Sequence, residues 1–260
     1  MDTDLARTIA EAYGWQRRLG NAQIVAPHCH IIADPAHANV WDSNHADDVT
    51  AQTEAEINAV FATMDQHLGH TRWRVIHTDC FTPDAFLARL ALDDFEEQPV
   101  TIQMALQGDI TERGAPIELR PIACDTDWNA LLQLVLADHA EGRRTNDLDI
   151  PPEVSAGMVA GYRAKRGAFH FHLAGRDGIP IAYGGYAIAP KDLFTLQSAR
   201  RQGIATAMIA VFTHRLRSAG CHTIFLGALA TERPKHLYAR LGFHAVMLAR
   251  GWMRRLPGTG

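Results

Sequence analysis

The stretch "FTLQSARRQGIATAMIAVF" (residues 194–212) decides the fold, because it predicts a strand, a short loop and an amphipathic helix in immediate succession. The helix begins at Ile204, keeps apolar residues on one face and ends before Gly220. Its first turn presents backbone N–H groups without helical acceptors, at the positive end of the helix dipole. A helix start of this kind suits a phosphate or pyrophosphate.

The loop itself, "ARRQGIAT" (residues 199–206), strengthens this interpretation. Gly203 permits close approach of the backbone to an anion, and Arg200 and Arg201 add positive charge. The alternative is an ordinary loop in which the glycine relieves a turn and the arginines are solvated. The segment has neither the Gly-Lys-Ser/Thr ending of a P-loop nor GxGxxG, which argues against nucleotide hydrolysis and NAD binding.

Length and composition indicate a soluble protein of one or two domains, and we expect two. The chain has 260 residues, 47% of them apolar, and a formal charge of −4, which argues against a general nucleic-acid partner. The four cysteines form no CxxC pair, so reduced thiols are expected. The N-terminus lacks a basic-then-apolar leader and no segment approaches a membrane span, so we expect a cytoplasmic protein without a membrane partner.

The seam between the two expected domains is "QGDITERGAP" (residues 107–116), where apolar periodicity stops and Gly and Pro appear. We place the boundary near Arg113, giving domains 1–112 and 113–260. The second domain predicts the order β-α-α-β-β-β-α-β-α-β, a mixed-sheet α/β or α+β fold. Its first helix, "TDWNALLQLVLADH", is predicted to be capped at Asp125 or Thr126.

The first domain also predicts alternating helices and strands. Residues 3–19 form a helical pattern, "QIVAPHCHII" (residues 23–32) suggests a strand, and residues 34–48 suggest a long connection. Thr53 and Glu56 form a capping box for the next helix. The strands "TRWRVIHTD" and "PVTIQMAL" flank a short helix for which Thr82 is the predicted N-cap, with Pro83 at its first position.

Two motifs in the second domain resemble those of the GNAT superfamily of N-acetyltransferases. Residues 200–205 have the form R-x-x-G-x-A, and "LYARLGF" (residues 237–243) is similar to the second signature of that family at a typical distance downstream. The resemblance covers residues 116–257. Gln197 stands where a proline is common, and Thr231 and Pro234 stand where Asn and Ala are common.

The resemblance implies a GNAT fold with acetyl-CoA as co-substrate and no metal. The strand before the loop is then expected to splay from its neighbour and pair with the pantetheine arm. The implied contacts are the backbone of Leu193, Phe194 and Thr195 for pantetheine, the N–H groups of Arg200, Arg201, Gln202, Gly203, Ile204 and Ala205 for pyrophosphate, and the hydroxyl of Thr231.

By its place in the second motif, Tyr238 matches the general acid of the family. A tyrosine hydroxyl stays protonated at neutral pH and can protonate a departing thiolate. The alternative is a tyrosine packed under its helix. The general base remains open between Asp192, Glu153 and a water chain.

The implied reaction is acetyl transfer by direct attack of a primary amine in a ternary complex, with a small-molecule or peptide amine as acceptor. Asp147, Asp149 and Glu153 either attract a cationic amine or form a solvated acidic loop. His170 and His172 share one strand face and either border the acceptor or pack. The alternative function is an acyl-CoA-binding sensor without turnover. A monomer and a homodimer are both compatible with the sequence.

An echo of the second motif lies in the first domain. "AFLARLAL" (residues 85–92) repeats the Ala-Arg-Leu core, but Leu87 replaces the tyrosine and Ala91 the glycine, and no arginine-glycine loop precedes it. We therefore expect a tandem protein whose N-terminal GNAT-like half is degenerate and non-catalytic. "HCH" (residues 28–30) brings three metal-ligand types together, but Cys29 points away from the histidines in a strand, so a metal site is not expected.

Overall fold

A computed structural model of the chain describes residues 2–146, 150–187 and 190–257, with the side chains at 142–146 and 190–194 outside that description. The chain divides into two compact units. Unit 1 comprises Met1–Gln103, Gly227–Lys235 and Ala245–Gly260, and unit 2 comprises Met104–Leu226 and His236–His244. These units differ from the continuous halves 1–112 and 113–260, because most of the last strand belongs to unit 1.

Most of unit 1 comes from the first hundred residues. Its helices are α1 (Thr3–Arg18), α2 (Glu54–His67) and α3 (Asp84–Leu92), and its strands before residue 98 are β1 (Ala22–Ala26), β2 (Cys29–Ala33), β3 (His45–Asp47), β4 (Trp73–Thr78) and β5 (Glu96–Glu97). Strands β6 (Thr101–Leu106), β11 (Phe225–Leu229) and β12 (Phe243–Arg255), and helix α7 (Pro234–Arg240), contribute residues to both units.

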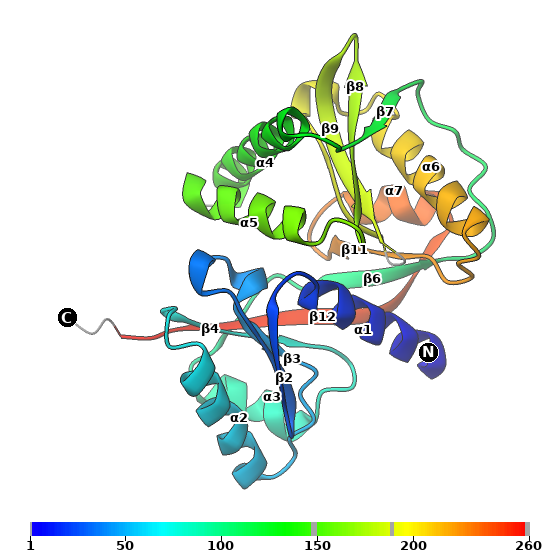
Figure 1. The fold of residues 1–260 in the computed structure, drawn as a ribbon. Coiled ribbons are helices and arrows are strands. Elements are labelled where there is room, and N and C mark those ends of the chain that lie inside the picture. Colours follow the sequence, from blue (N-terminus) through cyan, green and yellow to red (C-terminus); the bar gives the residue numbers. More distant parts are fainter. Residues whose placement is uncertain (1, 147–149, 188–189, 258–260) are drawn as a thin grey trace. The chain divides into compact units, whose positions relative to one another are not determined.

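An eight-stranded sheet, counted over the described residues, runs β1-β2-β3-β4-β12-β6-β11, with β5 paired to β12. In unit 1, apolar side chains of α2 and α3 pack on one face of β2–β4, where Ile31, Ala46 and Ile76 are fully buried. Helix α1 lies on the other side of these strands in Figure 1. Successive side chains of a strand point to opposite faces of the sheet, so apolar side chains on either face are buried only if helices pack on both faces.

Of the local predictions for the first domain, one is confirmed and others are wrong. The capping box is confirmed: the Glu56 N–H bonds to the Thr53 hydroxyl, and the Glu56 carboxylate accepts from the Thr53 N–H at 2.9 Å. The single strand expected at residues 23–32 is wrong, because β1 and β2 form a hairpin that turns between Ala26 and Cys29. Pro27 at this turn has no N–H for a strand ladder. Strand β3 lies within the region expected to be a connection.

The predicted N-cap at Thr82 is wrong as well. Pro83 occupies the N-cap position of α3, and no side chain caps the helix. The Thr82 hydroxyl instead accepts a hydrogen bond from the Asp79 N–H at 3.1 Å, which closes the preceding turn. A hydroxyl used in this way is not available to the helix.

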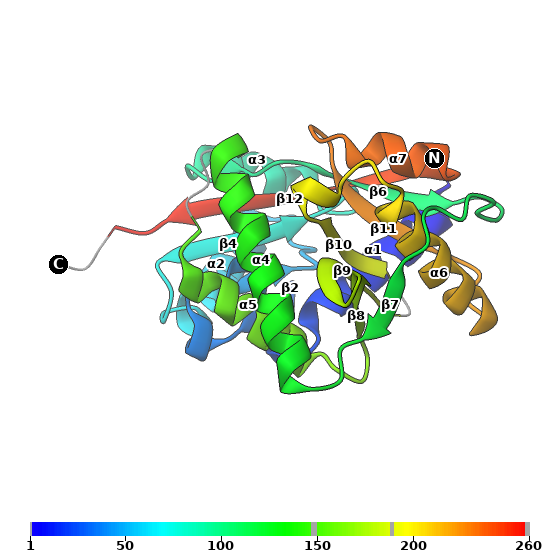
Figure 2. The ribbon, with the colours of Figure 1, turned by 90° about the horizontal axis from the view of Figure 1, so that it is seen from above.

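Residues 113–260, most of which belong to unit 2, have the predicted element order. The further elements of unit 2 are β7 (Glu118–Pro121), α4 (Asp125–Asn146), α5 (Pro152–Ala164), β8 (His170–Arg176), β9 (Ile179–Tyr186), β10 (Pro190–Thr195) and α6 (Ile204–Ser218), with a 3₁₀ turn at Gln197–Ala199 before α6. A four-stranded antiparallel sheet runs β10-β9-β8-β7 over the described residues. Helices α4 and α5 cover one face of this sheet and α6 the other (Figures 1 and 2).

The start of α4 differs from the prediction of a cap at Asp125 or Thr126, since both residues lie inside the helix. The Asp127 carboxylate accepts hydrogen bonds from the N–H groups of Ala123, at 2.9 Å, and Cys124, at 3.2 Å. It also pairs with Arg120 of β7. A carboxylate in the first turn accepts hydrogen bonds from N–H groups, and the positive end of the helix dipole stabilises its negative charge.

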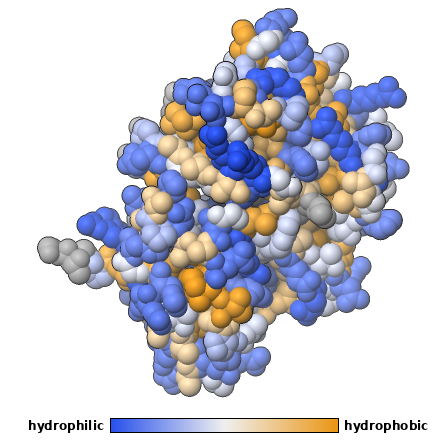
Figure 3. Space-filling model, viewed as in Figure 1, coloured by the Kyte–Doolittle hydropathy of each residue, from blue (hydrophilic) through white to orange (hydrophobic). Residues whose placement is uncertain are grey.

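The surface is mostly polar on the face shown in Figure 3. Among the described residues, the large apolar side chains that are exposed belong to separate elements: Trp15, Val25, Leu92, Ile179 and Leu248. Scattered exposure of this kind is ordinary for a folded protein. None of the described helices combines the length and apolar character needed to cross a bilayer.

A layer of buried polar side chains lies between α1 and β3 in unit 1. His45 is 0% exposed and packs edge-on against His77, with ring centroids 4.7 Å apart. Asp47 is 1% exposed and accepts a hydrogen bond from Arg18 Nε at 3.1 Å. Burial lowers the pKa of both histidines. Burial alone raises the pKa of Asp47, but His45 and the two arginines of α1 hold it well below its ordinary value.

This layer predicts that the protein loses stability in mild acid. Because His45 and His77 are neutral when buried, the unfolded chain takes up more protons below its ordinary histidine pKa of about 6.5. The free energy of unfolding should therefore fall by about 1 kcal/mol per pH unit for each histidine as the pH drops below that value. Urea unfolding at several pH values measures this slope.

The variant His45→Asn should flatten the slope, whereas His222→Asn, at an exposed position, should leave it unchanged. Below about pH 4, protonation of Asp47 should add to the loss. A free energy of unfolding that stays constant between about pH 7 and pH 5 contradicts the prediction.

Candidate functional site

Strand β10 is an edge strand that leads into the predicted loop. It pairs with β9 alone in the described sheet, with Leu193 opposite Gly184, Phe194 opposite Tyr183 and Thr195 opposite Ala182. Strand β11, which follows α6 in the chain, ends the other sheet. The strands before and after α6 are thus edges of separate sheets, and the splay between them stays a prediction.

The register of β10 shifts between Lys191 and Leu193, which leaves Asp192 without an opposite residue. An irregularity of this kind bends an edge strand and is frequent beside functional sites. The side chain of Asp192, a candidate base, lies outside the described side chains, as do those of Leu193 and Phe194. Their predicted roles stay predictions.

The loop before α6 turns sharply at two left-handed residues. Arg201 has φ of 60° and Gly203, the N-cap of α6, has φ of 76°. Within the described part of the chain, the N–H groups of residues 201–206 have no recorded hydrogen-bond acceptor. The Arg200 N–H, which was predicted to join them, bonds instead to the Gln197 carbonyl. The remaining groups leave a helix start of the kind that suits an anion, and their binding of pyrophosphate stays a prediction.

The end of the seam, at Gly114 and Ala115, forms part of this site, which the sequence analysis missed. The Ala115 N–H donates to the Gly203 carbonyl at 3.3 Å, and that carbonyl also accepts from the Ala207 N–H at 3.0 Å. A Cβ on Gly114 would lie 2.4 Å from the Ala207 nitrogen, and one on Gly203 would lie 2.9 Å from the Ala115 nitrogen. Both glycines are therefore required by a close backbone approach. The glycine in "RGAP" (residues 113–116) was the feature of the sequence that could have indicated this close approach.

Arg200 is bound within the protein. Its Nε donates to the Thr195 carbonyl at 2.9 Å, and its two terminal nitrogens donate to the carboxylate of Glu141 on α4 at 2.5 and 2.9 Å. The paired guanidinium holds the loop to α4, and its charge is partly neutralised. Arg201 is exposed, and Gln202 accepts a hydrogen bond from Arg176 of the β8–β9 hairpin at 2.7 Å.

The two predicted side-chain roles on the C-terminal side lie on and just before α7. Tyr238 is 7% exposed, and its ring lies 6.3 Å from that of Phe243, centroid to centroid. Thr231 is exposed in the turn between β11 and α7. Burial of the Tyr238 ring is compatible with both sequence interpretations, the acid and the packed residue.

Helix α4 places two further polar pairs beside the sheet and α5. The Tyr183 hydroxyl donates to Asp138 at 3.3 Å, and His139 Nδ1 lies 2.7 Å from the Ser155 hydroxyl. Tyr183 is the register partner of Phe194 on β10. Glu153 is exposed in the first turn of α5, whereas Asp147 and Asp149 lie outside the described residues.

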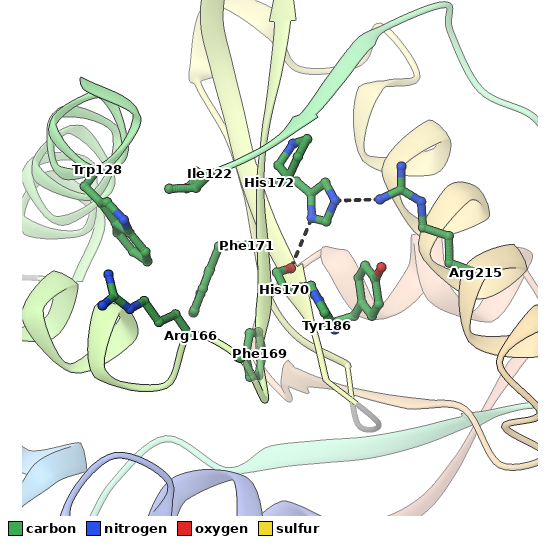
Figure 4. Close-up of a pocket in the computed structure, with 11 residues that line it drawn as sticks. Ile122, Trp128, Arg166, Phe169, His170, Phe171, His172, Tyr186 and Arg215 are labelled. Carbon is green, nitrogen blue, oxygen red and sulfur yellow. Dashed lines mark hydrogen bonds between the residues drawn. The ribbon is translucent and has the colours of Figure 1, made fainter. Parts of the chain in front are cut away.

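His170 and His172 lie on one face of β8, as predicted, and they line a cavity of about 380 Å³ (Figure 4). His172 is 3% exposed, and its Nδ1 lies 3.1 Å from the His170 carbonyl while its Nε2 lies 2.5 Å from Arg215 NH1. The imidazole therefore donates through Nδ1 and accepts through Nε2. Burial lowers the pKa of His172 to about 4; the hydrogen bond to the His170 carbonyl opposes this shift, and the positive charge of Arg215 adds to it.

The "HCH" sequence is divided between two elements, because His28 lies in the hairpin turn and Cys29 and His30 lie in β2. Among the residues that the structure describes, no three His, Cys, Asp or Glu side chains gather as metal ligands.

The close approach at Gly203 predicts a measurable cost for a methyl group. Gly203→Ala should lower the free energy of unfolding by about 2 kcal/mol, because it adds a steric conflict with Ala115 to the strain of a left-handed residue. Gly178→Ala is the matched control, since Gly178 has φ of 75° and open space around it. It should cost only the backbone strain, about 1 kcal/mol. Equal losses in urea unfolding contradict the proposed contact.

The neutral state of His172 gives a second prediction. In Arg215→Gln, the pKa of His172 should rise by about one unit, since a positive neighbour is removed, and stay below about 6.5 because the ring remains buried. NMR titration of the imidazole signals measures it. Arg217→Gln removes the same charge from α6 but not from the contact with His172, so its His172 pKa should match the wild type. A wild-type pKa near 6.5 contradicts the assignment.

Comparison with known proteins gives a consistent result. Residues 128–243 match the model of the Acetyltransferase (GNAT) family. No curated protein matches the sequence significantly.

Among solved structures, a GCN5-related N-acetyltransferase from Kribbella flavida is 17% identical with a TM-score of 0.67, covering 98% of this chain and 96% of that one. A functionally unknown conserved protein from Staphylococcus epidermidis is 12% identical with a TM-score of 0.68, over 91% and 95%. A tandem GNAT protein from the clavulanic acid biosynthesis pathway is 13% identical with a TM-score of 0.57, over 83% and 76%. Residues 128–243 thus match the GNAT acetyltransferase family model, and the chain as a whole shares the fold of GNAT acetyltransferases, a tandem one among them.

Proposed function

We propose that the protein transfers the acetyl group of acetyl-CoA to a primary amine in a ternary complex. The observation that carries the proposal is the edge strand β10 leading into N–H groups at residues 201–206 without recorded acceptors in the described chain. These features lie in the segment that matches the GNAT family, whose fold supports acyl transfer from acetyl-CoA.

The residues fit an acyl-CoA without a metal. Acetyl-CoA supplies the thioester and a pyrophosphate. The open edge of β10 at Leu193, Phe194 and Thr195 suits an extended amide chain, and the N–H groups after Arg200 suit the pyrophosphate. The Arg200 side chain is paired with Glu141. We therefore assign the positive charge that attracts the pyrophosphate to Arg201 and to the start of α6. Thr231 offers a hydroxyl, and its role remains the least supported.

In the transfer, the amine nitrogen bonds to the acetyl carbon, the carbon–sulfur bond breaks, the amine loses a proton and the thiolate gains one. Tyr238 is the proposed donor of that proton through its hydroxyl. Of the base candidates, Asp192 lies at the irregular point of β10 and Glu153 is exposed on α5. Neither is favoured over a water chain.

The N-terminal half is proposed to be a non-catalytic partner. Leu87 of α3, at the place of the tyrosine in the second motif, packs against the apolar core of unit 1. A leucine has no hydroxyl and cannot donate a proton to a thiolate. We propose a supporting half, residues 1–112, and a catalytic half, residues 113–260, and a monomer and a homodimer both agree with this proposal.

Release of free thiol from acetyl-CoA in the presence of a panel of amines tests the activity. The rate with Tyr238→Phe should fall by roughly a hundredfold at neutral pH, because the departing thiolate loses its proton donor. Tyr13→Phe, which removes a hydroxyl from α1, is the matched control and should retain the wild-type rate.

An undiminished rate in Tyr238→Phe across the pH range contradicts the acid role alone. Calorimetric binding of CoA without turnover on any amine favours the alternative, an acyl-CoA sensor. Failure of CoA to bind rejects both functions.

A further inference from the structure

The cavity beside His172 lies away from the arginine-glycine loop. Tyr186, the last residue of β9, lines it, and its register partner Pro190 is the first residue of β10. The loop follows the opposite end of β10, where the Leu196 N–H bonds to the Ile181 carbonyl. The cavity is therefore separate from the proposed acyl-CoA contacts. At about 380 Å³, it falls within the usual range for small-molecule sites, roughly 300–1,000 Å³.

The cavity is lined by cationic side chains and by no carboxylate among the described residues. Arg166 and Arg215 both line it, and neither has a recorded partner of opposite charge in the described part of unit 2. Elsewhere in that unit, Arg120, Arg163 and Arg200 each reach a carboxylate. Two guanidinium groups without compensating charge make the cavity attractive to an anion.

The contact between Arg215 and His172 fixes how the guanidinium is presented. His172 holds its proton on Nδ1 against the His170 carbonyl, so Nε2 accepts one hydrogen bond from Arg215. One of the five guanidinium N–H groups is thereby used and the others remain as donors. A neutral imidazole orients the arginine without cancelling its charge.

The walls of the cavity are aromatic. Trp128, Phe169 and Phe171 lie on one side of β8, and Tyr186 lies on the side of Arg215 (Figure 4). Tyr186 also stacks on His172, with ring centroids 5.6 Å apart. On the side of Arg215, the ring of Tyr186 favours a planar apolar body, and the arginine favours a planar anionic group that accepts two parallel hydrogen bonds.

We propose that this cavity binds a small carboxylate-bearing molecule with a planar apolar body, and that Arg215 holds the carboxylate. A carboxylate satisfies the free donors of the guanidinium and compensates its charge. The proposal concerns binding alone, so it does not rest on acetyl transfer.

Calorimetry on the full chain with benzoate, and with benzamide as its neutral counterpart, tests the proposal. Benzoate should bind saturably, and at least about tenfold more tightly than benzamide. In Arg215→Gln, benzoate affinity should fall by at least about tenfold, because the bidentate partner is lost. Arg217→Gln is the matched control: it removes the same charge from α6, but its partners are the Asp109 carboxylate and the Cys221, His222 and Gly108 carbonyls, outside the cavity.

Four results overturn the proposal: no saturable benzoate binding up to about 10 mM, equal affinity for benzamide, an equal loss of benzoate affinity in both variants, or inorganic phosphate bound as tightly as benzoate. The comparison of benzoate with benzamide uses the wild-type protein, so it decides the question even if Arg215→Gln does not fold.

Discussion

The close approach of residues 114–115 to the first turn of α6 is the constraint on which the functional site depends. The carbonyl of Gly203 accepts two hydrogen bonds, one from the N–H of Ala207 in the helix and one from the N–H of Ala115. The loop is thus fixed from outside the helix, while Glu141 fixes it from α4 through Arg200. A site whose donors are oriented before the ligand arrives loses less conformational freedom on binding. The β8–β9 hairpin adds a third support through Arg176.

Sequence analysis predicted the parts of the fold that are governed by neighbouring residues. The Thr53–Glu56 box, helix α6 and the element order of residues 113–260 follow from spacings within one turn or one strand. Errors occurred where a polar side chain had competing partners. Thr82 bonds to Asp79, and Asp127, one or two residues beyond the expected cap, reaches back to Ala123. Local patterns identify such residues as capping types without specifying which N–H they satisfy.

The candidate site was predictable as a backbone feature and less so as a set of side chains. The loop conformation follows from Gly203 and the helix that begins after it. The partners of Arg200 and Arg215 lie 59 and 43 residues away, and no local spacing predicts them. The charge available to a ligand depends on these long-range pairs: Glu141 neutralises one arginine, whereas His172 leaves the other charged.

The exchange of strands between the compact units has a consequence for synthesis on the ribosome. Unit 1 contains most of the first hundred residues, yet its β4 pairs with residues 250–255 of β12. Domains usually fold in order as they emerge, N-terminal first. Here β4 has β3 on one side, but it lacks β12 on the other side until residues 250–255 leave the exit tunnel. An exposed strand edge during that interval makes the nascent chain a natural client for chaperones.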